Sequence, residues 1–156
     1  IGFYVVKALK WWDIGRFTGH IKDYSKRDKL VADIKSRFTK EKAAQANHTN
    51  IVKWMSANFT KCSTGASYIT YKTNASGSTT NYNCSNNAQN HLNYMVNHLR
   101  YDGFNNPYVA AEPAAYNSSS TNPPDGRTHI TCSGNICKIV TDTGGNKNKS
   151  ATVEKE

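Results

Sequence analysis

The sequence predicts an α+β protein in which basic N-terminal helices precede a small antiparallel sheet. Three observations lead to this prediction. Hydrophobic residues recur at helical intervals through the first third of the chain, strand-like alternation follows Cys62, and the number of cysteines is even. A chain of 156 residues has the length of one domain. From Cys62 onward we expect the order strand, strand, helix, strand, strand, with the two hairpins joined in one sheet and the helix on one face.

Residues 1–61 are expected to form a basic, amphipathic helical segment. They hold thirteen lysines and arginines against five acids, whereas the other 95 residues are nearly neutral. The hydrophobic spacing predicts a helix over 27–46, carrying Leu30, Val31, Ile34 and Phe38, and a second helix over 50–60 that Thr49 caps. This charge asymmetry indicates an anionic partner such as a membrane surface or nucleic acid.

Residues 1–21 are predicted to form a mostly apolar helix or helical hairpin, and on a helix they carry one polar stripe. This stripe consists of Lys7, Lys10, Asp13 and Arg16, which recur every three residues. Two interpretations remain open: a helix buried in the core or against a second chain from the same precursor, or a helix lying in a membrane interface. In the second case the membrane-binding residues are Phe3, Tyr4, Lys7, Lys10, Trp11, Trp12, Arg16 and Phe17.

Residues 62–143 are predicted to be the cysteine-containing α+β region. We expect, in order, a strand over 66–73, a return strand over 79–84, a helix over 86–102, a loop over 112–127 and strands over 128–132 and 136–141. Residues 144–156 are polar, and we expect them to be a flexible tail.

The four cysteines are predicted to form disulfides in an oxidising compartment. They are Cys62, Cys84, Cys132 and Cys137, and the sequence leaves all three pairings open. The predicted hairpins would bring Cys62 near Cys84 and Cys132 opposite Cys137. Reduced thiols in a cytosolic protein are the alternative. The spacing does not match a zinc knuckle, and we expect neither a metal nor a cofactor.

Two further features indicate secretion. Acceptor sequences for N-glycosylation occur at six positions, which are Asn47, Asn58, Asn74, Asn83, Asn117 and Asn148. The chain begins at Ile1 without a methionine, so we expect a mature, extracellular fragment released by cleavage.

Histidine chemistry is one candidate for catalysis. His98, His129 and Lys138 could serve acid–base cleavage of RNA, with one imidazole taking the 2′-hydroxyl proton and the other protonating the leaving oxygen. No Gly-rich phosphate loop, metalloprotease motif or nucleophile elbow is present, so the sequence favours a role that is not enzymatic.

The predicted strand 66–73 suggests a carbohydrate site. Tyr68 and Tyr71 could stack on the sugars of a cell-wall polysaccharide. Cross-strand packing of the same rings is the alternative.

The second half of the chain resembles small secreted fungal proteins related to the yeast killer toxins. The resemblance lies in residues 62–71, in Asn83-Cys84-Ser-Asn-Asn-Ala-Gln89 before a helix, and in Cys132-Ser-Gly-Asn-Ile-Cys137. It implies maturation in the secretory pathway, binding to a cell-wall polysaccharide and damage to the plasma membrane. We therefore expect a secreted cytotoxic protein, with a basic ribonuclease toxin and a non-catalytic binding module as the alternatives.

Overall fold

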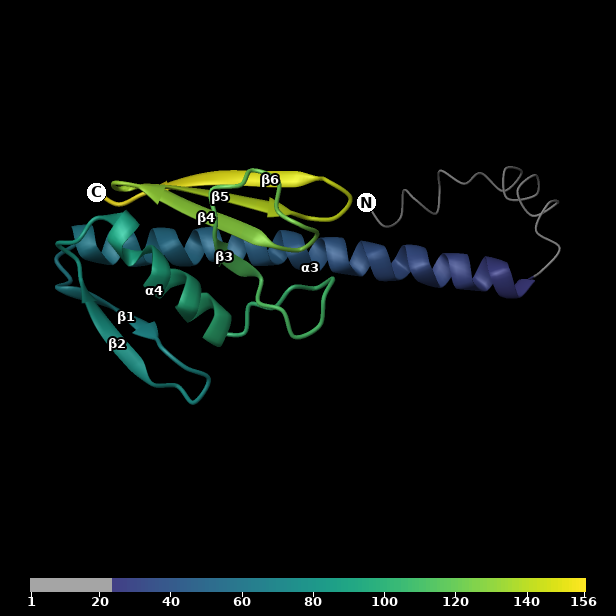
Figure 1. Cartoon of the computed structure of the whole chain (residues 1–156), viewed down its shortest axis with the longest axis horizontal. Coiled ribbons are helices and arrows are strands. Elements are labelled where there is room, and N and C mark those ends of the chain that lie inside the picture. The colour runs from purple at the N-terminus through teal and green to yellow at the C-terminus, as the bar shows by residue number, and fades with distance from the viewer. Residues whose placement is uncertain (1–23) are drawn as a thin grey trace. The chain divides into compact units, whose positions relative to one another are not determined.

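The computed structural model describes residues 24–156 (Figure 1). The predicted helix over 1–21, with its membrane-binding residues, lies outside the described part. Contacts between Cα atoms divide the chain into one unit that ends at Arg37 and a second that comprises Phe38–Glu156. The described fold is α+β, with two helices, two sheets and two disulfides.

The first described element is one continuous helix, α3, which covers Tyr24–Ser63. The predicted break near Thr49 is therefore wrong. No glycine or proline interrupts residues 24–63. The Thr49 hydroxyl donates to the carbonyl of Gln45, 3.0 Å away, instead of capping a new helix. A threonine that bonds the preceding turn in this way can sit inside a helix.

The second half of α3 is amphipathic and provides one wall of the core. Its innermost residues recur every three or four positions, which places them on one face; they are Ala44, His48, Ile51, Met55 and Phe59. The core thus includes residues of the predicted 1–61 segment. The second compact unit begins at Phe38, before the predicted boundary at residue 62.

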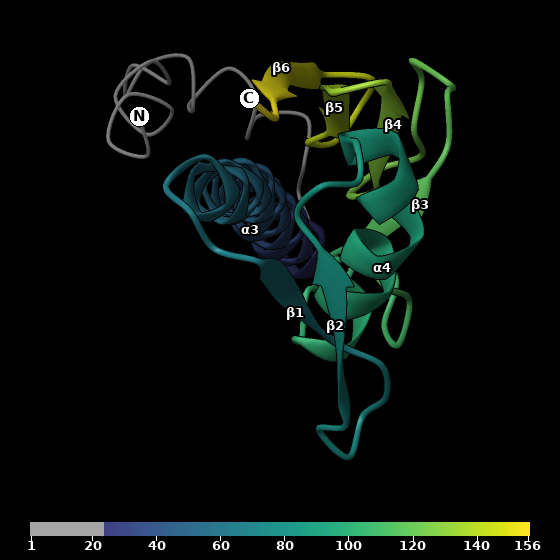
Figure 2. The same ribbon diagram turned by 90° about the vertical axis from the view of Figure 1, so that its left-hand side faces the viewer.

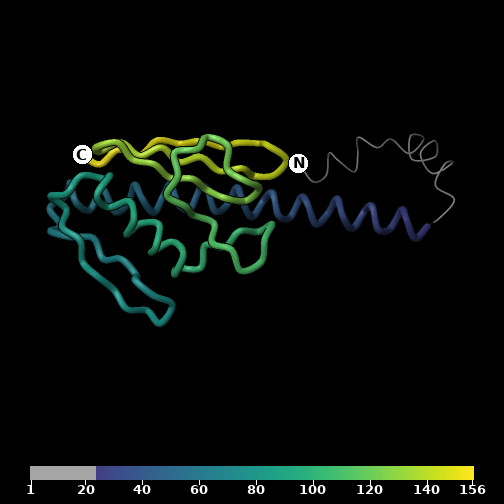
Figure 3. The backbone as a smooth tube through the Cα atoms, in the orientation of Figure 1, coloured from purple at the N-terminus to yellow at the C-terminus, as the bar shows by residue number. Residues whose placement is uncertain are grey.

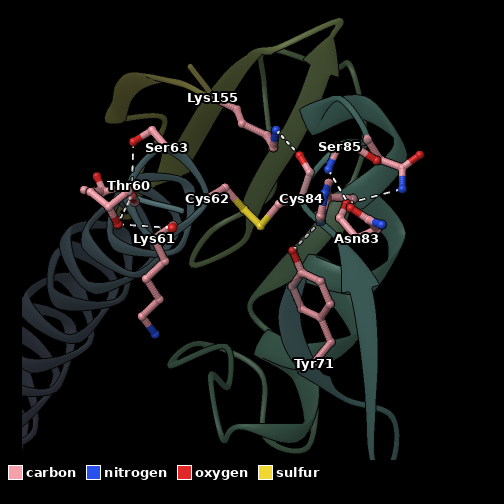
Figure 4. The surroundings of a disulfide bond; sticks show 12 residues. Thr60, Lys61, Cys62, Ser63, Tyr71, Asn83, Cys84, Ser85 and Lys155 are labelled. Carbon is pink, nitrogen blue, oxygen red and sulfur yellow. Dashed lines mark hydrogen bonds between the residues drawn. A yellow bond between two sulfur atoms is a disulfide. The ribbon is translucent and has the colours of Figure 1, made fainter. Parts of the chain in front are cut away.

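A hairpin follows, formed by β1 (Tyr68–Lys72) and β2 (Thr79–Asn83). The strands pair antiparallel, with Tyr68 opposite Asn83 at the open end. A disulfide between Cys62 and Cys84 ties this open end to the last turn of α3 (Figure 4). The hairpin and this bridge are both as expected.

Helix α4 covers Ala88–Tyr101, close to the predicted range. The side chain of Asn87 accepts a hydrogen bond from the backbone N–H of Asn90, which caps the first turn. The helix ends at Asp102, and Gly103 follows with a positive φ of 88°. The predicted apolar face is buried, and comprises Leu92, Met95, Val96 and Leu99.

The remaining strands form a second, four-stranded sheet in the order β3–β4–β5–β6. The strands are β3 (Ala115–Asn117), β4 (Thr128–Ser133), β5 (Ile136–Asp142) and β6 (Asn148–Glu154). β3 is parallel to β4, and the loop between them can be followed in Figure 3. The expected single antiparallel sheet is therefore wrong, because β1 and β2 pair only with each other and the second sheet is mixed.

The predicted flexible tail is also wrong. Strand β6 pairs antiparallel with the whole of β5, from Ile136 opposite Glu154 to Asp142 opposite Asn148. Val153 is buried in the hydrophobic cluster. Most side chains of β6 are exposed and polar. The sequence of β6 therefore lacks the alternating apolar residues from which a strand is predicted.

One hydrophobic cluster joins the second half of α3, the hairpin, α4 and the four-stranded sheet. Figure 2 shows these elements around a common interior. Ile51 and Met55 of α3 belong to the cluster, together with Tyr71 of the hairpin, Leu99 of α4 and Ile139 of the sheet. Because four elements depend on this cluster, its loss would unfold the whole second unit.

Two isoleucines test whether only the second half of α3 contributes to the core. Ile51 is fully buried, whereas Ile34 is 48% exposed. We expect Ile51→Ala to lower the free energy of unfolding by about 2–5 kcal/mol, because it leaves a cavity in the core. The matched change Ile34→Ala should alter it by less than about 0.5 kcal/mol. Urea unfolding followed by circular dichroism measures both, and equal losses would contradict the described core.

Candidate functional site

The start of α3, residues 24–37, presents exposed apolar side chains. Leu30, Val31 and Ile34 are 43%, 44% and 48% exposed. Spacings of three and four place all three on one face of the helix. This exposed set is called the apolar stripe below. Isolated apolar side chains on a surface are ordinary, but an ordered row along a helix is more typical of an interaction surface.

Basic residues occupy much of the remaining surface of this segment. Residues 24–37 contain five lysines and arginines against two aspartates, which gives a net charge of +3. At 100° per residue, Lys29 falls on the side of the helix away from the apolar stripe, whereas Lys26 and Arg37 flank the stripe next to Leu30. Arg27 lies nearer the stripe and stands over the Tyr24 ring, 5.2 Å from its centroid. Exposed apolar side chains flanked by cations can lie in a membrane interface, with the cations reaching the headgroups.

No helix within residues 24–156 is both long enough and apolar enough to cross a bilayer. The sequence-predicted membrane residues between Phe3 and Phe17 lie outside the described part. The apolar stripe is therefore the described surface that bears on membrane binding. The helical spacing of Leu30, Val31 and Ile34 is visible in the sequence. The membrane-binding residues were nevertheless predicted within residues 1–21.

The histidines predicted for RNA cleavage are not brought together. His98 of α4 accepts a hydrogen bond at Nδ1 from the backbone N–H of Lys72, 2.9 Å away, and stacks on Trp54. His129 of β4 bonds the carbonyl of Ser120 at 3.0 Å. α4 packs on the face of β4 that carries Ile130 and Cys132, and alternation along the strand places His129 on the other face.

Lys138 shares the outer face of the sheet with His129. It pairs with Thr131 in the register of β4 and β5, two residues along from His129, and is exposed. A two-histidine acid–base mechanism needs both imidazoles within reach of one phosphodiester. With His98 and His129 on opposite faces of the sheet, the described structure gives this mechanism no support.

His91 and His98 are instead structural parts of an aromatic cluster that sequence reasoning did not find. His91 is fully buried, and its Nδ1 lies 2.8 Å from the Tyr71 hydroxyl. The rings of Tyr82 and Tyr94 stack with centroids 4.4 Å apart, and Tyr82 meets His91 edge to face. The spacing of His91, Tyr94 and His98 along α4 was the available signal, since it puts them near one face.

Burial keeps these histidines neutral. Desolvation and the nearby Lys149 lower the pKa of His48 to about 4. The Nδ1 of His48 lies 2.8 Å from the hydroxyl of Thr141. Burial also lowers the pKa of His91, helped by Lys155, and the pKa of His98, where Asp102 acts in the opposite direction. Each of these rings therefore resists protonation in the folded state.

The predicted carbohydrate pair is separated by the hairpin. Tyr68 is 53% exposed, whereas Tyr71 is fully buried and bonded to His91. An odd spacing of three residues places the two side chains on opposite faces of β1. The predicted joint stacking of Tyr68 and Tyr71 on sugars is therefore wrong, and the packing alternative holds for Tyr71.

The six glycosylation sequences differ in accessibility. Asn83, Asn117 and Asn148 are exposed, and Asn47 and Asn74 are half-buried. Asn58 is buried within α3, and its Nδ2 donates to the carbonyl of Trp54 at 2.9 Å. In the folded chain the Asn58 amide is thus less accessible than those of the exposed acceptor asparagines.

All four cysteines are paired, as Cys62–Cys84 and Cys132–Cys137. In Figure 4 the first bridge lies beside the Cys84 carbonyl, which accepts a hydrogen bond of 2.6 Å from the ammonium of Lys155. The second bridge joins directly opposed residues of β4 and β5. These two pairings are the ones that the predicted hairpins favoured, and they are compatible with an extracellular protein.

Comparison with protein-family models, with curated proteins and with solved structures finds no match to this chain. The resemblance to killer toxins therefore remains a hypothesis drawn from the sequence.

The buried histidines predict a loss of stability in acid. The pKa of His48 is lower in the folded chain than the 6.5 of a free imidazole, so the unfolded state takes up protons first. Its stabilising contribution is complete above pH 6.5 and declines as the pH falls toward 4. We expect the free energy of unfolding to drop by about 2 kcal/mol between pH 7 and pH 5 from His48 alone. His48→Gln should flatten this dependence in urea titrations, whereas an unchanged slope would contradict it.

Tyr71→Phe tests the buried hydrogen bond to His91. Losing the Tyr71 hydroxyl would leave the buried Nδ1 of His91 without its partner. We expect the free energy of unfolding to fall by about 1–3 kcal/mol. Tyr68→Phe, on the exposed face of the same strand, is the matched control and should change it by less than about 0.5 kcal/mol. Thermal unfolding measures both variants, and equal losses of stability would contradict the buried hydrogen bond.

Proposed function

We propose that this chain is a secreted, killer-toxin-like cytotoxic protein that binds the anionic plasma membrane of a target cell. The observation that carries the proposal is the apolar stripe, which lies exposed on a helical segment of net charge +3. Membrane binding by such a helix requires an apolar face for the acyl boundary and cations for the headgroups. Residues 24–37 supply both.

Burial of the apolar stripe in the interface supplies the hydrophobic part of the binding energy. Leu30, Val31 and Ile34 expose nearly half of their surface, and each contributes on the order of 1 kcal/mol when that surface leaves water. Three such side chains alone give only weak, reversible binding. The cationic residues add about 1 kcal/mol each near an anionic surface. Both parts are needed together, which makes the binding selective for anionic membranes.

The leading segment would reinforce this binding under the membrane interpretation of its sequence. Trp11 and Trp12 would lie at the level of the headgroups, with Lys7 and Lys10 beside the phosphates. The disulfide-bonded second unit supports the proposal in another way. Its two bridges are compatible with a protein that acts outside the cell.

The proposal is tested with vesicles and two matched isoleucines. The 156-residue protein should sediment with vesicles that contain phosphatidylserine and release an enclosed dye, with much weaker binding to pure phosphatidylcholine. Ile34→Gln should weaken binding about 5–10-fold, since it removes one member of the apolar stripe. Ile136→Gln changes an isoleucine of similar exposure, 51%, at the start of β5 and should leave binding unchanged.

Charge is tested separately with Lys29→Gln. We expect a loss of about 5-fold on anionic vesicles and none on neutral ones. Equal binding of the unmodified protein to both kinds of vesicle would contradict the proposal. The same conclusion would follow if Ile34→Gln and Ile136→Gln behaved alike.

A further inference from the structure

Strand β6 is an outer strand of the four-stranded sheet, because the order β3–β4–β5–β6 leaves it with one neighbour. In Figure 2 it lies at the end of the sheet on the side of α3. The N–H of Lys155 donates to the carbonyl of Asn135 at 2.9 Å, and the N–H of Thr143 donates to the carbonyl of Lys147 at 2.9 Å. These bonds at both ends of β6 show that its odd-numbered residues direct their backbone groups toward β5.

The even-numbered residues of β6 direct their backbone groups to the other side. Along an antiparallel strand these groups point alternately to either side, so those of Ser150, Thr152 and Glu154 face away from β5. None of them makes a hydrogen bond at this edge within residues 24–156. A strand edge with unpaired N–H and C=O groups is a template for a further strand.

Along the first half of β6, side chains of this chain fill the seam between β6 and α3. The ammonium of Lys147 lies 3.3 Å from both carboxylate oxygens of Glu41. Two residues further along, the ammonium of Lys149 donates to the Thr49 hydroxyl at 3.3 Å. These contacts tie the start of β6 to the helix.

The second half of the seam opens into a hollow of about 250 Å³. Its lining comes from both elements and comprises Ser56, Phe59, Thr60 and Ser63 of the helix, and Thr152, Val153, Glu154 and Glu156 at the end of the chain. All of these residues belong to the unit Phe38–Glu156. The hollow therefore lies against the unpaired part of β6. A chain added to this edge would direct every second side chain toward α3.

The hollow is suited to a cation. Glu154 and Glu156 are the charged residues of its lining, and neither carboxylate makes an ion pair within residues 24–156. The hydroxyl of Thr60 donates to the carbonyl of Ser56 at 2.9 Å, and that of Ser63 donates to the carbonyl of Thr60 at 3.0 Å. Since both hydroxyl protons are engaged, the two oxygens face a ligand as acceptors.

We propose that this edge and hollow form a docking site for an extended, basic peptide segment of a partner protein. The peptide adds a fifth strand beside β6, and its backbone bonds the free groups of Ser150, Thr152 and Glu154. In such strand addition the main-chain bonds supply affinity and pockets for alternate side chains supply specificity. An arginine or lysine that enters the hollow meets two carboxylates, while its methylene stem lies along the wall.

The glycosylation sequence at Asn148 lies at the other end of β6. Asn148 and Glu154 are the first and last residues of this strand. They are separated by about 20 Å in extended backbone, so a glycan at Asn148 is attached away from the hollow. The docking site goes beyond the proposed function and does not depend on it, since residues 24–37 take no part.

The pairing is tested with labelled octapeptides by fluorescence polarisation in about 0.15 M salt. In the parent peptide arginine alternates with threonine, which favours an extended chain. We expect it to bind the 156-residue protein with a dissociation constant below about 100 μM, and a counterpart with glutamate in place of arginine to bind at least about 10-fold more weakly. Two further peptides are N-methylated on every arginine or on every threonine. Only one set of amides can face β6, so one of these peptides should lose binding and the other should retain it.

Two serines of α3 test the hollow. Ser56→Trp fills it and should weaken binding of the parent peptide at least about 10-fold. Ser36→Trp changes an exposed serine of the same helix outside the hollow and should bind as before.

Two acidic residues test the charge. Glu154→Gln removes one carboxylate of the hollow and should weaken binding about 3–10-fold. Asp33→Asn removes an exposed carboxylate elsewhere on α3 and should have no effect. Circular dichroism checks the folding of each variant. Because Glu154→Gln preserves the side-chain shape, it keeps the test valid if Ser56→Trp does not fold.

The proposal is overturned if the parent peptide does not bind, if the two N-methylated peptides behave alike, or if neither Ser56→Trp nor Glu154→Gln weakens binding. Sedimentation shows whether a second copy occupies the edge instead. We expect a monomer without peptide, and a dimer that Ser56→Trp dissociates would reject the peptide as occupant. Vesicle binding and peptide binding are separate measurements on separate surfaces, so the failure of one leaves the other standing.

Discussion

Burial of one face of α3 is the constraint on which the described fold depends. Ile51, Met55 and Phe59 contribute to a cluster that also includes residues of the hairpin, α4 and the four-stranded sheet. The two sheets share no strand pairing, so the common hydrophobic interior holds them in one unit. The Cys62–Cys84 bridge adds a covalent tie between the helix end and the hairpin.

This interior is unusual in that neutral histidines form part of it. His48 and His91 are almost fully buried, and each bonds a hydroxyl, Thr141 and Tyr71 respectively. A buried imidazole with such a partner packs well when neutral and is costly to protonate. The histidines thus link stability to pH. The same burial and hydrogen bonding make His91 and His98 part of the core packing. The five histidines of the chain had suggested acid–base catalysis.

The proposed membrane surface follows the charge asymmetry of the sequence. Residues 24–37 combine cations with exposed aliphatic side chains, which suits an anionic, partly apolar surface. Almost all of the net charge lies in residues 1–61.

The sequence by itself determined the α+β class, the hairpins and α4, because short-range periodicity and turn residues specify local structure. The even number of cysteines predicted disulfides but left their pairing open. Only the tertiary structure decided which sides of these elements are buried. Tyr71 and Tyr68 look equivalent in a strand, but packing buries one and exposes the other. Strand β6 has too few apolar residues to be predicted, and forms because β5 supplies a full set of backbone partners. A surface hollow beside α4 is lined by residues from Tyr82 to Cys132, which lie far apart in the sequence and meet only in the folded chain.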